Sequence, residues 1–469
     1  MTKAAIIGGG VIGGGWAARF LLSGWDVNVY DTDPEAERKI GEVLDNARRS
    51  LPALHEHALP PEGTLTFATS LDEAVKGTTW IQESVPERLE IKHKVFAEIQ
   101  KHCPADALIG SSTSGFKPSE LQEGAERPRQ IFVAHPFNPV YLLPLIELVG
   151  TPDTTARASK VLDGIGMKPL VVRQEIDAHI ADRFLEAVWR EALWLIKDGV
   201  ATTEEIDDAI RFGFGLRWAQ MGLFETYRIA GGEAGMAHFI EQFGPALQWP
   251  WTKLMDVPEL TDELVQTIAS QSDEQSGAHS IRELERIRDD NLVVMMRALK
   301  TRDWGAGALL KAQDKTLKPT YDTTQELITV RRVIPIDWTD YNGHMNESRY
   351  GQLWSDAADE IMELIGADAD YIKSGLSYFT VDTHTRFLNE CHAGDPIHVQ
   401  THVLVGEGKK LRLHHEMKDA NGDLVSTCTQ MLIHVSLETR RSCPPADTVA
   451  ANLAKLVDDQ SNLPKPEDV

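Results

Sequence analysis

Near its start the chain reads Ala4-Ala5-Ile6-Ile7-Gly8-Gly9-Gly10-Val11-Ile12-Gly13, an apolar run that passes directly into a glycine-rich turn. Apolar residues continue at helical spacing to Leu22, so the segment predicts a strand, a tight turn and a helix. The glycines have the spacing G-x-G-x-x-G, in which the first makes the turn, the second admits a pyrophosphate and the third lets helix and strand pack closely. We therefore expect a dinucleotide to contact Gly8, Gly9, Gly10, Val11, Ile12 and Gly13.

The following segment supplies the acidic residue that such a site requires. A second apolar strand is predicted at residues 26–30, and Asp31 comes directly after it. A carboxylate there accepts hydrogen bonds from the ribose hydroxyls of the adenosine half. The same charge repels a 2′-phosphate, and Thr32-Asp33 offers no arginine to neutralise one. We predict NAD, and not NADP, as the cofactor.

Length and charge describe a modular, acidic protein. At roughly 100 to 200 residues per domain, the 469 residues provide for about three domains. Lys plus Arg number 47 against 71 Asp plus Glu, a net charge of −24 that repels nucleic acid and anionic membrane surfaces. No apolar run approaches the ~20 residues of a membrane span. We expect a cytoplasmic protein with small-molecule partners, and neither nucleic acid nor membrane.

The cysteines give no sign of a metal site or a disulfide framework. They are Cys103, Cys391, Cys428 and Cys443, and no two of them form a C-x-x-C pair. Widely spaced cysteines of this kind are typical of reduced thiols. No metal site is predicted.

A candidate acid–base pair follows the predicted dinucleotide site. Apolar strands are expected just before Glu87 and before Ser114, and ligands of parallel sheets bind beyond the carboxyl ends of the strands, near where the nicotinamide would lie. Oxidation of an alcohol requires a base for the hydroxyl proton, and His135 is our candidate. Glu147 is a charge within an otherwise apolar strand, so we expect it to pair with His135. Ser114 would hold the substrate hydroxyl.

Residues 1 to about 320 resemble the 3-hydroxyacyl-CoA dehydrogenase superfamily, which couples a nucleotide-binding domain to a helical dimerisation domain. Besides the glycine turn with Asp31, the resemblance rests on Glu87, Lys92, Ser112-Thr113-Ser114, His135-Pro136-Phe137-Asn138-Pro139 and Glu147. It implies that His135 is the base, Glu147 its orienting partner and Ser114 a substrate contact. It also implies that Glu87 and Lys92 lie at the cofactor and that the protein is a homodimer.

The middle of the chain is helical and rich in aromatic residues. Apolar side chains fall on nearly every side of the helix predicted at 180–196, which indicates that this helix is buried. Thr202 and Glu205 predict a capping box for the next helix. Most of the tryptophans here are expected in the core, and a few could form an aromatic box for a quaternary ammonium group. These tryptophans are Trp189, Trp194, Trp218, Trp249, Trp251 and Trp304.

Two features favour a cationic hydroxy acid as the substrate. Where the superfamily has Asn-Arg, this chain has Asp182-Arg183, and a carboxylate suits a cation unless it pairs with Arg183 or another neighbouring cation. The runs from Gly213 to Gly222 and from Gly231 to Met236 resemble the superfamily members that oxidise L-carnitine. Arg183 and Arg217 are candidates for holding the substrate carboxylate.

A different architecture begins near residue 327. Strands are expected at 327–334, 378–387, 396–405, 411–418 and 424–437, with a long helix that starts near Tyr350 and ends at Gly366. Asn421-Gly422 predicts the hairpin between the last two strands. One long helix wrapped by an antiparallel sheet is the α+β hot-dog fold.

The loop before this helix carries a second catalytic motif. Asp340-Tyr341-Asn342-Gly343-His344-Met345-Asn346 resembles the motif of hot-dog acyl-CoA thioesterases of the 4-hydroxybenzoyl-CoA thioesterase type, whose catalytic aspartate corresponds to Asp340. A carboxylate there can attack the thioester or activate water, while the following helix stabilises the oxyanion. Whether Asp340 is nucleophile or general base stays open. His344 and Asn346 are expected to order the loop and cap the helix.

The fold class is multidomain. We predict an α/β Rossmann domain at 1–178, an all-α dimerisation domain at 179–322, a hot-dog domain at 327–440 and a C-terminal tail at 441–469. The resemblances imply NAD-dependent oxidation of L-carnitine to 3-dehydrocarnitine, together with hydrolysis of an acyl-CoA thioester, betainyl-CoA. One alternative is a 3-hydroxyacyl-CoA or L-gulonate 3-dehydrogenase with a broad thioesterase. Another is a NAD-binding structural or sensory protein whose hot-dog domain only binds acyl-CoA.

Overall fold

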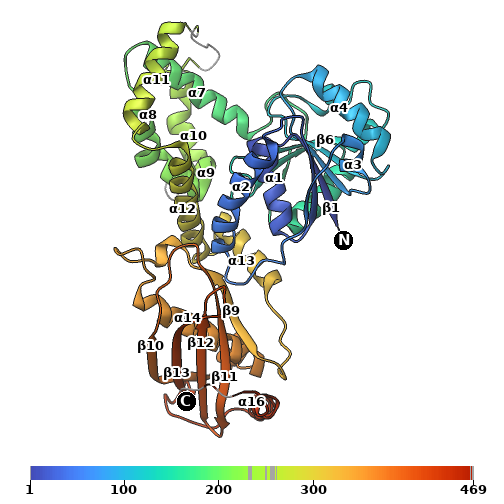
Figure 1. Ribbon diagram of the computed structural model, residues 1–469. Coiled ribbons are helices and arrows are strands. Elements are labelled where there is room, and N and C mark those ends of the chain that lie inside the picture. The colour runs from blue at the N-terminus through green and yellow to red at the C-terminus, as the bar shows by residue number, and fades with distance from the viewer. Residues whose placement is uncertain are drawn as a thin grey trace. The chain divides into compact units, whose positions relative to one another are not determined.

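The computed structural model describes residues 2–230, 235–248, 251–253, 259, 261–464 and 466 (Figure 1). The chain forms two compact units, Met1–Arg48 with Pro60–Ala312 and Arg49–Leu59 with Gln313–Val469. A parallel sheet lies in the first unit and an antiparallel sheet in the second. The predicted fold class is thereby confirmed, while the residue boundaries of the four predicted segments stay predictions.

The first unit is built on an eight-stranded sheet in the order β3-β2-β1-β4-β5-β6-β7-β8. Neighbouring strands are parallel except β6 and β7, which are antiparallel. The strands are β1 (Lys3–Ile7), β2 (Asp26–Tyr30), β3 (Leu65–Phe67), β4 (Trp80–Glu83), β5 (Leu108–Ser111), β6 (Ile131–Pro136), β7 (Leu145–Val149) and β8 (Lys168–Val171).

Helices cover both faces of this sheet (Figure 1). The helices connecting its strands are α1 (Val11–Leu22), α2 (Ala36–Ser50), α3 (Leu71–Val75), α4 (Leu89–His102), α5 (Pro118–Leu121) and α6 (Pro152–Gly164). Trp16 of α1 lies 6.0 Å from Trp80 between ring centroids, whereas the next residue of β4, Ile81, packs with Phe96 of α4 on the opposite face. Burial on both faces explains why these strands read as continuous apolar runs.

The turn between β1 and α1 requires glycine at two positions. Gly8 has a φ of +101°, and a Cβ there would lie 2.6 Å from the carbonyl oxygen of Ser84. A Cβ on Gly13 would lie 1.8 Å from the carbonyl oxygen of Gly8. A side chain at Gly8 would collide with the backbone that follows β4, and one at Gly13 would force α1 away from β1, so the close helix–strand packing predicted for Gly13 is confirmed. A Cβ on Gly10, by contrast, would meet nothing within 4 Å.

The middle of the chain is helical, as predicted. Its helices are α7 (Ala181–Lys197), α8 (Thr203–Ala209), α9 (Gly215–Ala230), α10 (Gly235–Phe243), α11 (Asp262–Ser276), α12 (Ile281–Lys300) and α13 (Ala306–Leu317). The capping box of Thr202 and Glu205 is present at the start of α8. The run from Gly213 to Gly222 begins within a π-helical turn at Ile210–Phe214 and continues into α9, where Gly222 adopts a φ of +71°.

The prediction that the first of these helices is buried is wrong for the chain described. In α7 only Leu193 is buried, while Phe184, Leu185 and Trp189 are 54%, 55% and 62% exposed. Helical periodicity identifies which side chains are apolar, but it does not reveal how many neighbouring elements the chain has to cover them. Within the described part of the chain, the apolar side of α7 that carries Phe184, Leu185 and Trp189 is exposed.

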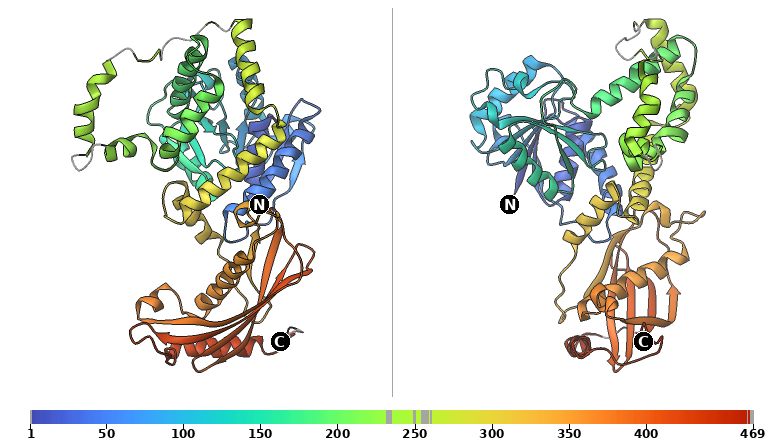
Figure 2. Two further views of the ribbon diagram at one scale, coloured as in Figure 1. Left: turned by 90° about the vertical axis from the view of Figure 1, so that its left-hand side faces the viewer. Right: turned by 180° about the vertical axis from the view of Figure 1, so that it is seen from behind.

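The second unit is a five-stranded antiparallel sheet in the order β10-β13-β12-β11-β9. Its strands are β9 (Leu327–Val333), β10 (Leu376–Phe387), β11 (Pro396–Glu407), β12 (Lys410–Lys418) and β13 (Leu424–Ser436). The long helix α14 (Glu347–Ile365) runs along the sheet and buries Leu353, Trp354 and Ile361 in its core (Figure 2). Gly366 ends α14 in the left-handed conformation, so the predicted helix stop is confirmed.

Three further segments complete this unit. After α14 comes the short helix α15 (Ala369–Lys373), and near the end of the chain α16 (Asp447–Gln460) packs Val449, Leu453 and Leu456 into the core. The third segment, Arg49–Leu59, lies early in the sequence, and its His55 Nδ1 lies 2.8 Å from Asp314 Oδ1 in a buried pair. No motif in the sequence indicated that this segment belongs with the second sheet.

A buried histidine on β12 makes the stability of the second unit depend on pH. His415 is fully buried and stacks on Trp354, with ring centroids 5.8 Å apart. The Thr401 hydroxyl lies 2.8 Å from Nδ1, and Nε2 lies 3.2 Å from Gln430 Oε1, so the neutral imidazole satisfies both nitrogens. Burial lowers the pKa of His415 to about 3. The proton that an unfolded histidine binds near pH 6.5 is therefore excluded from the folded chain.

We expect His415→Gln to be less stable than wild type at pH 7.5 and to lose less stability on acidification. Between about pH 6.5 and pH 3 only the unfolded chain binds this proton, so lowering the pH to 5 costs wild type about 2 kcal/mol through His415. Scanning calorimetry of the full chain at both pH values measures the difference. His384→Gln, an exposed histidine of β10, should keep the wild-type pH dependence. Equal losses in His415→Gln and wild type would contradict the prediction.

Candidate active sites

The glycine turn of the first unit has the features that a dinucleotide site requires. Asp31, at the end of β2, accepts hydrogen bonds from the backbone N–H of Gly9 and, at 2.7 Å, from that of Asp33. Gly10 is the N-cap of α1 and has no side chain to bond the first N–H groups of the helix. These N–H groups and the helix dipole are suited to a phosphate, and the space beside Gly10 lets one approach. Residues 8–13 with Asp31 therefore fit the predicted NAD.

A buried ion-pair network follows the next strand. Lys92 of α4 is buried, and its Nζ lies 2.9 Å from Glu83 Oε1 and 3.1 Å from Glu87 Oε2. Glu87 in turn accepts hydrogen bonds from the Thr113 hydroxyl and, at 3.2 Å, from the backbone N–H of Ser114. The structure thus brings the predicted residues Glu87, Lys92 and Ser114 together. Lys92 Nζ also lies 3.4 Å from the Val85 carbonyl oxygen, so Lys92 joins Glu83 at the end of β4 to Glu87 in the following loop.

Glu83 is a member of this network that the sequence analysis missed. Its carboxylate also accepts hydrogen bonds from the Ser111 hydroxyl at 2.5 Å and the Val85 N–H at 2.8 Å. Burial raises the pKa of Glu83, and Lys92 opposes that shift. Glu83 is a charge in an apolar strand, the same signal that identified Glu147, so the sequence could have revealed it.

The predicted acid–base pair forms at the junction of sheet and helices. His135 Nδ1, near the end of β6, lies 3.0 Å from Glu147 Oε2 on the neighbouring strand β7, and the two residues are direct partners in the strand register. The other carboxylate oxygen, Oε1, accepts hydrogen bonds of 2.9 Å from the backbone N–H groups of Ile180 and Ala181 at the start of α7. Glu147 therefore joins the histidine to the amino end of a helix.

These hydrogen bonds determine the protonation states of Glu147 and His135. Burial alone would raise the pKa of Glu147, but the hydrogen bonds from His135, Ala181 and Ile180 outweigh it and hold the pKa below its usual value. The ionised carboxylate accepts the proton of Nδ1 and leaves Nε2 of His135 as the basic nitrogen. The site can thus take a proton from a hydroxyl group and stabilise the resulting imidazolium.

Two further ionisable residues lie beside this pair. His179 is buried, has a φ of +49°, and its ring centroid lies 5.6 Å from that of His135. Its Nε2 donates to the carbonyl of Thr113 at 3.3 Å, and burial followed by the charge of His135 lowers its pKa. The sequence analysis quoted His179 without assigning it a role, because a single histidine at a domain junction has no distinguishing pattern.

Asp182, in the first turn of α7, is the second. Burial, with the nearby carboxylates of Glu186 and Glu147, raises its pKa, although the charge of His135 opposes the shift. No hydrogen bond or ion pair to Arg183 is present within the described part of the chain. Asp182 therefore lies within the electrostatic field of the His135–Glu147 pair and does not form the neighbouring pair considered from the sequence.

The aromatic box stays a prediction. The ammonium groups of Lys197 and Lys253 lie 4.6 and 4.0 Å from the centroid of the Trp194 ring. The cations that contact this ring are therefore lysines of the protein. Trp189, Trp251 and Trp304 are exposed and Trp194 and Trp218 are half-buried, so the expectation that most of these tryptophans lie in the core is wrong for the described residues. Trp249 and the run Gly231-Gly232-Glu233-Ala234 lie outside the described residues.

The second motif forms a tight loop in front of α14. Asp340 Oδ1 accepts hydrogen bonds from the backbone N–H groups of Asn342 at 2.8 Å and His344 at 3.3 Å, and Asp340 N–H donates to the His344 carbonyl at 2.8 Å. The Asn346 side chain accepts the Ser348 N–H and caps α14, as predicted. A half-buried carboxylate is thereby fixed by backbone contacts beside the amino end of a 19-residue helix.

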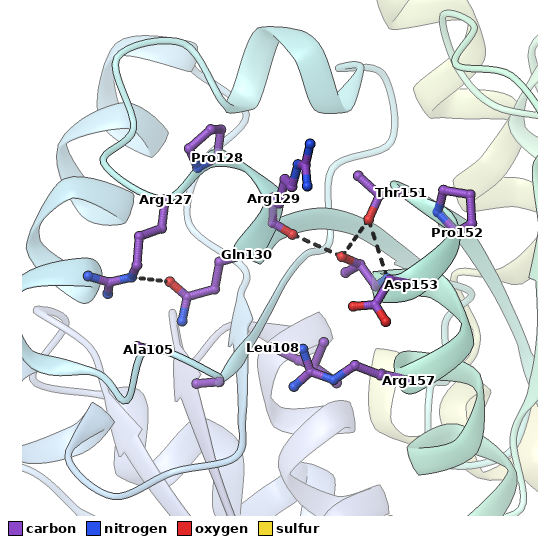
Figure 3. Close-up of a pocket in the computed structure, with 12 residues that line it drawn as sticks. Ala105, Leu108, Arg127, Pro128, Arg129, Gln130, Thr151, Pro152, Asp153 and Arg157 are labelled. Atoms are coloured by element: carbon purple, nitrogen blue, oxygen red, sulfur yellow. Dashed lines mark hydrogen bonds between the residues drawn. The ribbon is translucent and has the colours of Figure 1, made fainter.

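A large cavity in the first unit lies away from both motifs. Its volume is about 800 Å³ (Figure 3). It borders Leu108, the first residue of β5, whereas Ser114 follows the opposite, carboxyl end of that strand. None of the predicted site residues lines it, so cavity size does not identify the reaction site.

Family models match the chain in three segments. The NAD binding domain of 3-hydroxyacyl-CoA dehydrogenase matches residues 3–176, and the C-terminal domain of the same enzyme matches residues 179–269. A thioesterase-like superfamily model matches residues 334–453. The last match covers the Asp340 loop, all strands of the second sheet except β9, and part of α16.

Similar proteins and structures agree with these matches. A solved structure of an NAD+-dependent FHMPC 5-dehydrogenase superposes with a TM-score of 0.55 at 30% identity, over 64% of this chain and 99% of that chain. An L-carnitine dehydrogenase of Mesorhizobium japonicum is 60% identical over 326 residues, 68% of this chain and 90% of the relative.

Two relatives extend over both halves of the chain. A protein of Agrobacterium fabrum named L-carnitine dehydrogenase/betainyl-CoA thioesterase is 56% identical, over 95% of this chain and 93% of the relative. A protein of Ruegeria pomeroyi with the same name is 65% identical, over 100% of this chain and 98% of the relative. The chain therefore belongs to the L-carnitine dehydrogenase/betainyl-CoA thioesterase family, and its two 3-hydroxyacyl-CoA dehydrogenase-type domains are followed by a thioesterase-like domain.

Proposed function

We propose that this chain is a bifunctional enzyme that oxidises L-carnitine to 3-dehydrocarnitine with NAD and hydrolyses betainyl-CoA to glycine betaine and CoA. The observation that carries the first activity is the buried His135–Glu147 pair, with Nδ1 3.0 Å from the carboxylate, in the same unit as a glycine turn that fits a dinucleotide. The names of full-length relatives supply the two substrates.

In the first reaction His135 is the general base. NAD, when bound, supplies the hydride acceptor. Glu147 holds the proton on Nδ1, so Nε2 takes the proton of the 3-hydroxyl group, and the charged ring that results is stabilised by the same carboxylate. Ser114 would hold the hydroxyl, while Glu87 and Lys92 fix the loop at the end of β5 on which Ser114 lies.

We assign the trimethylammonium group to Asp182. Its carboxylate lies among the carboxylates of Glu186 and Glu147, which disfavour its charge, so a bound cation would relieve that repulsion. A quaternary ammonium has no N–H to donate, and its recognition by a carboxylate is therefore purely electrostatic. This explains how a site that resembles acyl-CoA enzymes could accept a small zwitterion.

In the second reaction Asp340 is the catalytic carboxylate. Its Oδ1 is held by two backbone N–H groups, and the amino end of α14, capped by Asn346, provides a positive dipole for the oxyanion of the thioester. In this position the Asp340 carboxylate can attack the thioester carbonyl or activate a water molecule that does so.

The remaining expectations are also proposals. The open apolar side of α7 is the surface that a homodimer would cover. No helix in the part of the chain that the structure describes is long and apolar enough to cross a membrane. A cytoplasmic location is our proposal, and nucleic acid is not expected as a partner because the chain carries a net charge of −24.

His135→Asn should lower kcat/KM for L-carnitine oxidation by at least about 100-fold, because general base catalysis contributes factors of ~10² to 10⁴. NADH formation is followed at about 340 nm with L-carnitine, D-carnitine, L-gulonate and a 3-hydroxyacyl-CoA. The variant should bind NAD as wild type does and should still hydrolyse betainyl-CoA. Turnover of gulonate or the acyl-CoA alone would overturn the carnitine assignment, and NAD binding without any turnover would favour a structural or sensory protein.

Asp182→Asn should raise KM for L-carnitine about tenfold or more with a smaller change in kcat, since loss of one charge–charge contact costs roughly 1 to 4 kcal/mol. Glu186→Gln is the matched control, because it removes a carboxylate one turn further along α7 that lies 3.8 Å from Arg190. The assignment of Asp182 fails if both variants raise KM equally, or if neither does.

Asp340→Asn should lower the rate of CoA release from betainyl-CoA by at least about 100-fold. Asparagine retains an Oδ1 acceptor for the Asn342 and His344 N–H groups, so the loop should keep its shape. Release of the thiol is followed with a chromogenic disulfide. The same variant must oxidise L-carnitine at the wild-type rate, and retained hydrolysis would mean that Asp340 is not the catalytic carboxylate.

A further inference from the structure

Three potential metal ligands lie together beside the Asp340 loop. His344 of that loop is directly opposite His392 in an antiparallel bridge, and the Met345 N–H donates to the Cys391 carbonyl at 2.8 Å. Directly opposite residues have Cβ atoms ~4.5 to 5.5 Å apart, within reach of a shared ion. Glu390 precedes His392 by two residues, and its carboxylate lies on the same side as both rings.

The distances match a tetrahedral zinc-type site. One ligand atom from each residue can be chosen so that all three lie within 4.8 Å of one another. His344 Nε2 and Glu390 Oε2 are 3.4 Å apart, close to the separation of about 3.3 Å between two ligands with zinc bonds of ~2.0 to 2.1 Å. The side chains of His392 and Glu390 are 56% and 69% exposed, so both can close the remaining gap without disturbing the core.

A second carboxylate prepares His392 for metal binding. Asp395 Oδ2 accepts the backbone N–H of His392 at 2.7 Å and lies 3.6 Å from its Nδ1. The 3.6 Å separation is longer than a hydrogen bond, and a small turn of the exposed imidazole would let Nδ1 donate to Asp395 and leave the lone pair of Nε2 for an ion. Histidines that bind zinc commonly have such a carboxylate partner.

We propose that His344, Glu390 and His392 bind a divalent transition-metal ion of the zinc class, with Asp395 supporting His392. Two imidazoles and one carboxylate suit ions of the zinc class, whereas Mg²⁺ and Ca²⁺ prefer oxygen ligands alone. The ion would tie the Asp340 loop to residues 390–395, because the Asp340 N–H donates to the His344 carbonyl at 2.8 Å and the His344 N–H donates to Asp340 Oδ1 at 3.3 Å. Its role would be structural, and Asp340 itself is not a ligand. The proposal departs from the prediction of no metal site.

The test uses the untagged full chain, stripped with EDTA and titrated with Co²⁺, a spectroscopic substitute for Zn²⁺. We expect one Co²⁺ per chain with visible absorption typical of a four-coordinate site, displaced by one equivalent of Zn²⁺. His392→Ala should weaken binding at least about 100-fold, and Asp395→Asn about tenfold, as loss of a supporting carboxylate does elsewhere. Glu390→Gln gives a second ligand variant that leaves the Asp340 loop unchanged.

His102→Ala is the matched control. It removes another exposed histidine next to a carboxylate, 3.1 Å from Glu98, but outside the proposed site. This variant should bind one Co²⁺ with the wild-type affinity. The proposal is overturned if wild type binds less than one ion per chain, or if His392→Ala and His102→Ala bind equally, since any ion present would then be adventitious.

Discussion

The first active site depends on a single carboxylate that serves two partners. Glu147 is fully buried. One of its carboxylate oxygens accepts a hydrogen bond from His135 Nδ1, and the other accepts hydrogen bonds from two backbone N–H groups at the start of α7. A buried charge of this kind is stable only when all its hydrogen-bonding capacity is used, so the sheet and the helix must both be in place before His135 is correctly oriented. The same contact that makes the histidine a base therefore also fixes where the helical domain begins, and it brings Asp182 and His179 to the site.

The residues around Ser114 are also held in place by carboxylates. Lys92 bridges two carboxylates, and through Glu87 it holds the Thr113–Ser114 loop. Glu83 and Ser111 are the last residues of β4 and β5, and His135 lies near the end of β6, so these residues lie at the carboxyl ends of parallel strands, where ligands bind. Glu147 thus orients the His135 ring, and Glu87 fixes the backbone at Ser114, so in both clusters a carboxylate positions a residue proposed to react.

The sequence predicted the turns, the helix caps and the helix stop correctly, because each depends on residues close together in the chain. The glycine turn, the capping box at Thr202, the Asn346 cap and the stop at Gly366 each depend on contacts within a few residues. The pairing of Glu147 was predictable because an isolated charge in a buried strand requires a partner. Burial of α7 was predicted wrongly, since covering it depends on elements that periodicity does not describe. Contacts between segments distant in sequence determine two further features, and no spacing rule indicates them. One is the place of Arg49–Leu59 in the second unit, and the other is the grouping of His344, Glu390 and His392.

The two proposed reactions cannot follow one another directly on this chain. Oxidation of the 3-hydroxyl group yields a keto acid without a thioester. The reaction assigned to Asp340 requires a CoA ester in which the bond from the keto carbon to the carboxymethyl group has been broken and the sulfur of CoA takes that group's place. A separate reaction must cleave the keto acid and form the thioester between them. A tunnel from one site to the other would therefore have no intermediate to carry. Joining the domains in one chain instead ensures that both are made in equal numbers. Under that view the two sites need no shared geometry, and each unit can keep the fixed carboxylate, Glu147 or Asp340, that its own chemistry requires.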